Sequence, residues 1–202
     1  MMTELSDSDI QQIVQKVVSR IHGEDSVAPA SLQISSPAQL VAIGSDHGGF
    51  ALKVDLIKHL QANRYEVLDC GTNNTEAVDY PDFALAVASK VAGGEAWRGI
   101  VIDGAGIGSC MAANKVVGVR AAMCYDYATA VNSREHNDAN LLTLGAGLIG
   151  PSLAKSILKT FLSTSFAGGR HAARVDKISN LERRFLRQGA PARWKHTESA
   201  TR

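Results

Sequence analysis

The stretch RGIVIDGAGIGSCMAANK, residues 98–115, joins an apolar run to a glycine-rich loop through a single carboxylate, Asp103. The run Ile-Val-Ile is typical of a buried parallel strand. Ligands of open α/β sheets bind at the carboxyl ends of such strands, and free N–H groups on a glycine loop ahead of a helix hold anions. We therefore predict an anion hole beside a titratable group, with the alternative that Asp103 only caps the next helix. The glycines of the loop are Gly104, Gly106 and Gly108.

Strand-like and helix-like segments alternate on both sides of this loop. Strands are expected at residues 41–46, 65–72, 100–102, 119–126 and 141–147, and helices at 47–63, 82–94, 112–116, 127–137, 151–165 and 176–188. Strands separated by helices need crossover connections, which produce a parallel sheet with helices on both faces. The pattern predicts a doubly wound, Rossmann-like α/β domain with a five-stranded parallel sheet.

Composition excludes several classes of protein. The chain has 202 residues, a formal net charge of +1 and 45% hydrophobic residues, which fits one domain with extensions. The near-neutral charge gives no electrostatic case for nucleic acid or a membrane surface. We find no 18-residue apolar run and no signal peptide. The three cysteines and the histidines lack metal-ligand spacing, so we expect no metal. An odd number of cysteines also argues against a complete set of internal disulfides, so we expect a location in the reducing cytoplasm.

The ends of the chain differ from the middle. Residues 1–22 carry an Ile/Val stripe at helical spacing and predict an amphipathic helix. Residues 23–39 have the composition of a linker, residues 40–188 form the expected α/β domain, and residues 189–202 form a flexible tail. Two roles are open for the helix. It packs on its own domain or a sister subunit, or residues 5–22 bind a shell protein, since the extension resembles the encapsulation peptides of bacterial microcompartments.

Several motifs occur together in one order. They are Asp46-His47-Gly48-Gly49, Asp79-Tyr80-Pro81, Asp103 with its glycine loop, Ala112-Ala113-Asn114-Lys115, His136-Asn137-Asp138-Ala139-Asn140, and Arg170-His171 with Arg174. From about Val41 to about Arg184 the chain resembles the ribose 5-phosphate isomerase B and galactose 6-phosphate isomerase family. One glycine loop is weak evidence, whereas the whole set in register is specific.

The resemblance implies an aldose-ketose isomerase acting on a sugar phosphate or related sugar through an enediolate, with no metal or other cofactor. It gives ring opening to His136, because an imidazole both donates and accepts protons near neutral pH. Asp46 binds sugar hydroxyls, and Tyr80 either lines the sugar pocket or packs at its turn. Asn137 and the N–H groups of Gly104, Gly106 and Gly108 hold the enediolate oxygen, while His47, Arg170 and Arg174 face the phosphate. In this family the site is shared between subunits, which implies a homodimer or a dimer of dimers.

Four positions depart from the family pattern. Many ribose-type members carry a cysteine base where this chain has Asp103, and others a glutamate where it has Ser109. Ala105 replaces a hydroxyl residue, and Gly147 stands where an arginine commonly contacts phosphate. One hypothesis makes Asp103 the replacement base of an enzyme with an altered site. Others are a partner-dependent subunit, similar to the A subunit of galactose 6-phosphate isomerase, or a hydrolase or lyase that reuses the anion hole.

Overall fold

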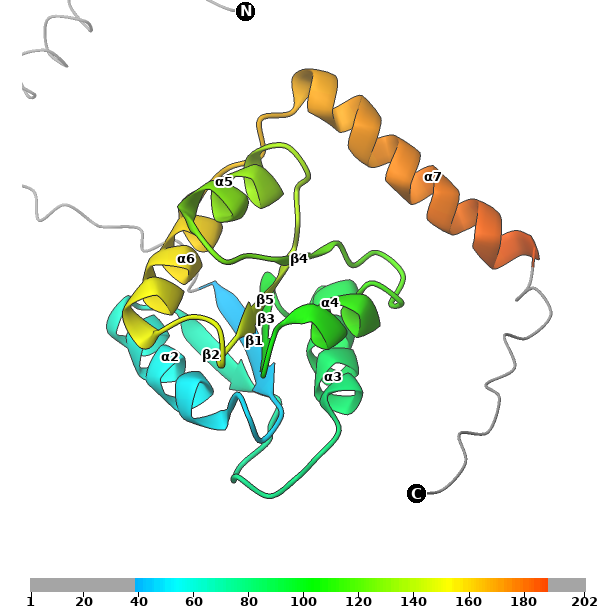
Figure 1. Cartoon of the computed structure of the whole chain (residues 1–202). Coiled ribbons are helices and arrows are strands. Elements are labelled where there is room, and N and C mark those ends of the chain that lie inside the picture. Colours follow the sequence, from blue (N-terminus) through cyan, green and yellow to red (C-terminus); the bar gives the residue numbers. More distant parts are fainter. Residues whose placement is uncertain (1–38, 189–202) are drawn as a thin grey trace, which may run out of the picture. The chain divides into compact units, whose positions relative to one another are not determined.

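Five parallel strands form one sheet in the order β2-β1-β3-β5-β4. Their bounds are β1 Leu40–Ser45, β2 Glu66–Asp69, β3 Arg98–Asp103, β4 Ala121–Met123 and β5 Leu141–Gly145. The structure, a computed structural model, describes residues 39–188 (Figure 1). In register, β1 pairs with β3 through Ser45 and Ile102, and β3 pairs with β5 through Asp103 and Gly145.

Helices cover both faces of the sheet. The helices α2 (Phe50–Ala62), α5 (Tyr127–Glu135) and α6 (Pro151–Ser163) lie on one face, and α3 (Tyr80–Ala92) and α4 (Ile107–Ala113) lie on the other (Figure 1). The predicted doubly wound, Rossmann-like fold is therefore confirmed.

The central strands explain why the apolar runs in the sequence are continuous. All five residues of β5 are buried, as are the last five of β3, because a helix layer lies on each side of them. On the α6 face, Leu144 and Phe161 are fully enclosed in a single apolar cluster. Burial of such a side chain contributes roughly 1.5–3 kcal/mol to folding.

Several boundaries differ from those expected. The helix α2 begins at Phe50 rather than at residue 47, and β4 has only three residues. The helix α4 begins at Ile107, directly after the loop, and ends at Ala113. The last helix, α7 (Ala172–Gln188), begins four residues early, after the short 3₁₀ turn η1 (Gly169–His171). Arg170 and Arg174 therefore belong to different elements.

One charged side chain is enclosed between α2 and the end of β2. Lys53 is fully buried, and its Nζ donates to Oδ1 of Asp69 at 2.5 Å and to the carbonyl of Thr72 at 2.7 Å. The same Asp69 oxygen accepts the N–H of Gly71 at 2.9 Å. A buried charge is tolerated where it is paired and hydrogen-bonded. Lys53 thus fixes the start of the long loop that leads from β2 to α3.

The predicted helix at 1–22, the linker up to residue 38 and the tail at 189–202 lie outside the described residues. Among the helices described, none is both long enough and apolar enough to cross a membrane.

Candidate functional site

Asp103 points into its own glycine loop. The residue ends β3 and is 4% exposed. Its Oδ1 accepts the N–H groups of Ala105, at 2.8 Å, and of Gly106, and its Oδ2 accepts the N–H of Ser109 at 3.0 Å. The carboxylate therefore caps the beginning of α4 and fixes the loop. The Asp103 carboxylate therefore occupies part of the anion hole that the sequence predicts beside it.

The glycines of this loop are needed for two physical reasons. Gly106 precedes α4 with a φ of 79°, a left-handed conformation that side chains rarely adopt. A Cβ on Gly108 would lie 2.5 Å from Cζ of Tyr80, so the phenol ring rests directly against the loop. Tyr80 is 40% exposed at the start of α3. Its ring thus packs on the glycine loop and still has an open face.

Asp46 and His47 lie at the same edge of the sheet. The N–H of Asp46 donates to the carbonyl of Ile102 at 3.2 Å, which places it beside the end of β3. The Asp46 side chain is 8% exposed and its Oδ1 accepts the N–H of Gly49 at 2.9 Å. His47 is exposed, and its Nδ1 lies 3.2 Å from both N and O of Val78. We call Asp46, His47, Tyr80, Asp103 and the glycine loop the carboxyl-edge group.

His136 and Asn137 follow α5, at a second location. The rings of His136 and His171 stack with centroids 4.1 Å apart and an interplanar angle of 5°. Asn137 donates from Nδ2 to Oδ1 of Asn132 at 3.0 Å. The N–H of Ala167 donates to the carbonyl of Glu135 at 3.0 Å, which ties the segment before η1 to the end of α5.

Arg170 in η1 and Arg174 in α7 are both exposed. We call His136, Asn137, Arg170 and Arg174 the amino-edge group. Removal from water lowers the pKa of His171, and the neighbouring charges of His136, Arg170 and Arg174 lower it further. Exposed guanidinium groups such as those of Arg170 and Arg174 suit the binding of an anion.

The two groups lie at opposite ends of the sheet within one chain. Asp103 pairs with Gly145 at the carboxyl end of β5. The helix α5 returns antiparallel to the strands, and His136 follows it, shortly before β5 begins at Leu141. The five residues of β5 alone span about 16 Å at roughly 3.3 Å per residue. The structure therefore brings together the members of each group, but one copy does not bring the two groups together.

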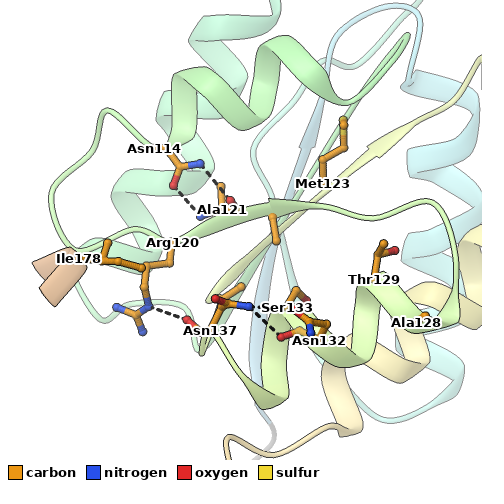
Figure 2. A pocket seen from close by; sticks show the side chains of 12 residues that line it. Asn114, Arg120, Ala121, Met123, Ala128, Thr129, Asn132, Ser133, Asn137 and Ile178 are labelled. Carbon is orange, nitrogen blue, oxygen red and sulfur yellow. Dashed lines mark hydrogen bonds between the residues drawn. The ribbon is translucent and has the colours of Figure 1, made fainter. Parts of the chain in front are cut away.

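A cavity of about 570 Å³ opens between β4, α5 and Ile178 of α7, and Asn137 is part of its wall (Figure 2). In Figure 2 the amide of Asn137 turns toward Asn132 of α5. Of the residues predicted for the site, Asn137 alone lines this cavity, so the cavity is not the carboxyl-edge site.

A scan against family models matches residues 41–178 to Ribose/Galactose Isomerase. The chain belongs to this family. Among its relatives, a putative sugar phosphate isomerase of Bacillus subtilis is 46% identical over 147 residues, or 72% of this chain and 99% of that protein. Ribose-5-phosphate isomerase B of Escherichia coli is 45% identical over 144 residues, or 71% of this chain and 97% of that protein.

Solved structures of the ribose/galactose isomerase family share the fold. Ribose-5-phosphate isomerase B of Clostridium thermocellum matches with a TM-score of 0.72 and 52% identity, over 72% of this chain and 99% of that one. The Mycoplasma genitalium enzyme with bound ribulose-5-phosphate matches with a TM-score of 0.70 and 42% identity, over 72% of this chain and 97% of that one.

Two residues that support these groups were not among the predicted site residues. His171 stacks on His136, and its place inside the quoted Arg170-His171 motif was the available signal. Lys53 holds the loop that leads to Tyr80, but its sequence context is that of an ordinary helix lysine. Only the fold reveals its burial.

Proposed function

We propose that the chain is an aldose-ketose isomerase that acts on a sugar phosphate through an enediolate, at a site shared by two copies. The observation that carries the proposal is the carboxyl-edge group, a glycine loop flanked by Asp46, Tyr80 and Asp103, in a chain 45% identical to ribose-5-phosphate isomerase B of Escherichia coli. The substrate named for that relative is a phosphorylated sugar, and family membership supports the same chemical class here.

In this proposal Asp103 is the base. Each carboxylate oxygen has two acceptor positions, and Oδ2 accepts one N–H, so one position remains for a substrate proton. The N–H groups of Gly104 and Gly108 donate to no other described residue and are free to stabilise the enediolate oxygen. Oxyanion donors contribute about 3 kcal/mol each in comparable sites. Gly106 acts indirectly, because its N–H already holds Asp103.

A second copy supplies the rest of the site. His136 transfers the ring-opening proton, and Asn137 donates to the enediolate oxygen. Arg170 and Arg174 of that copy, together with His47 of the first, bind the phosphate, since guanidinium groups form paired charge-assisted bonds with oxyanions. The separation of the two groups in one chain supports a homodimer or a dimer of dimers.

The test is exchange of the C2 proton of aldose and ketose phosphates with deuterated solvent, followed by NMR on the purified full-length protein. We expect exchange with at least one sugar phosphate. Exchange is lost in Asp103→Asn, because an amide is not a base, and is retained in Asp103→Cys, because a thiolate is a base although it is not a carboxylate. Folding of each variant is checked by circular dichroism. Absence of exchange across the panel in the folded wild type contradicts the proposal.

A second candidate is a catalytically altered or partner-dependent subunit. The observation that favours it is that the Asp103 carboxylate takes three N–H donors of the loop. In that case exchange is absent in the protein alone and appears only when a related subunit is added.

We also propose a cytoplasmic location, with residues 5–22 as the segment that binds a shell protein. Support comes only from the apolar stripe in the sequence. Deletion of residues 1–30 is expected to change cellular location and leave sugar-phosphate exchange intact. A change in oligomer size or activity without a change in location contradicts this role.

A further inference from the structure

Asn132 contacts two residues of the amino-edge group. It lies in the last turn of α5, four residues before His136, so the two side chains are neighbours on the helix surface. Its Nδ2 lies 2.9 Å from Nδ1 of His136, and its Oδ1 lies 3.0 Å from Nδ2 of Asn137. A single side-chain amide therefore joins the residue proposed for ring opening to the residue proposed for the enediolate oxygen.

The direction of these hydrogen bonds follows from one backbone carbonyl. Nδ2 of Asn137 also lies 3.1 Å from the carbonyl oxygen of Asn132, and a carbonyl oxygen only accepts hydrogen bonds. Asn137 is therefore the donor in this pair, and the side-chain atom of Asn132 that faces it is the oxygen (Figure 2). The other arm of the Asn132 amide is then the NH2 group, which donates. Nδ1 of His136 must therefore be the acceptor.

The acceptor role fixes the tautomer of His136. A neutral imidazole carries one proton, and the ring nitrogen that accepts a hydrogen bond is the one without it. The proton is therefore on Nε2, on the side of the ring away from Asn132. The ring of His171 stacks on His136 with centroids 4.1 Å apart and an interplanar angle of 5°. The stack restricts the plane of the imidazole, and Asn132 restricts its rotation within that plane.

We propose that Asn132 is a positioning residue that selects the Nε2–H tautomer of His136, so that Nε2 gives its proton to the ring oxygen of a cyclic sugar phosphate. The inference rests on the proposed function, because it concerns the ring-opening step. In that step the bond between C1 and the ring oxygen breaks, and the ring oxygen takes the proton from Nε2. The anomeric hydroxyl loses its proton to water and becomes the carbonyl of C1, and Nε2 regains a proton from water.

The first test uses a substitution that changes one of the two contacts. Asn132→Asp keeps an oxygen toward Asn137 but turns a second oxygen, which only accepts, toward His136. The full-length protein is labelled with isotope-enriched histidine, and nitrogen NMR at about pH 9, where histidine side chains are neutral, shows which ring nitrogen is protonated. The signals of His136 are those missing from His136→Asn. We expect the proton on Nε2 in the wild type and on Nδ1 in Asn132→Asp.

The second test separates ring opening from the later proton transfer. Ribose 5-phosphate, named for the Escherichia coli relative, is cyclic and must open before its C2 proton exchanges with deuterated solvent. Ribulose-5-phosphate, named for the Mycoplasma genitalium structure, is an open chain and exchanges its C1 proton without that step. At saturating substrate and about pH 9, we expect Asn132→Asp to slow the first exchange by about tenfold or more and the second by less than about twofold.

The matched control is Asn180→Asp, which adds the same charge at an exposed position of α7 and leaves the tautomer and both exchange rates unchanged. A wild-type protein with the proton on Nδ1 overturns the proposal, and so does an Asn132→Asp protein with the wild-type tautomer. Equal slowing of the two exchanges also overturns it, because the effect is then not on ring opening. Absence of exchange in the wild type contradicts the proposed function instead, and the spectra then decide the tautomer alone.

Discussion

At the scale of single residues, the side chain of Asp103 joins folding to the proposed chemistry. Its three bonds to backbone N–H groups hold the glycine loop in one conformation. The sequence predicted that a carboxylate stands at this point, and it left open whether the carboxylate caps or reacts. The orientation depends on the left-handed turn at Gly106, a torsion that the residue types alone do not specify.

We predict that Asp103→Asn lowers the free energy of unfolding by about 2 kcal/mol. The amide nitrogen of the asparagine is itself a donor, so it cannot accept the N–H of Ser109, which then loses its hydrogen bond. Urea denaturation measures the change. The control is Asp176→Asn on the exposed side of α7, which is expected to cost less than about 0.5 kcal/mol. Equal losses in the two variants contradict the capping role.

The stacked pair of His136 and His171 predicts a pH dependence. Because burial and the neighbouring cations lower the pKa of His171, folding disfavours its protonated form. The unfolded chain then binds more protons, so stability falls as pH drops below the ordinary histidine pKa of about 6.5. His171→Gln is expected to remove this part of the slope in urea denaturations between about pH 5 and 8. A slope unchanged by His171→Gln, or one equally reduced by the control His59→Gln, contradicts the assignment.

At the scale of elements, the boundaries that the sequence misplaced are those set by backbone geometry rather than by apolar periodicity. Gly168 and Gly169 have φ values of 63° and 52°, and the turn they form lets η1 run directly into α7 at Ala172. The periodic pattern becomes visible only later in α7, on a side with four apolar residues, each about half exposed. These are Ile178, Leu181, Phe185 and Leu186.

We predict that this exposed apolar row is a contact surface, because contiguous exposed apolar side chains are a feature of interaction sites. In the proposed dimer this surface contacts a second copy, so Leu181→Lys combined with Phe185→Lys is expected to reduce the oligomer to a smaller species. Size-exclusion chromatography with light scattering measures the mass. Lys177→Gln, at an exposed position of the same helix, is the control and leaves the mass unchanged. A variant of unchanged mass contradicts a role of this row in assembly.

At the scale of the whole molecule, the alternation of strands and helices was sufficient to predict the doubly wound sheet and the place of Asp103 at the carboxyl end of a strand. Alternation also implies that a residue after α5 stands at the amino end of the sheet, far from one after β3. The motifs were therefore enough to propose roles for Asp46 and His136, and in the proposed site these two residues come from different copies. Local patterns in the sequence do not specify which surfaces of two copies meet, so the composition of a shared site could not be predicted from them.

We predict complementation between two inactive variants. Asp46→Asn damages the carboxyl-edge group and His136→Asn the amino-edge group, so each homodimer loses both sites. After subunit exchange, half of the dimers are mixed and each has one intact site, which restores about a quarter of wild-type activity. The sugar-phosphate isomerase assay of the mixture measures this. A mixture no more active than its components contradicts a shared site, and mixing two Asp46→Asn samples is the blank.

Because Asp69 and Thr72 enclose the amine of Lys53, its chemical reactivity reports how often this part of the domain opens. We expect an acylating reagent to reach its nitrogen only when the contacts with Asp69 and Thr72 open, whereas exposed Lys58 on the same helix reacts without any opening. The ratio of the two labels in a mass spectrum therefore counts opening events in the native protein, without denaturant.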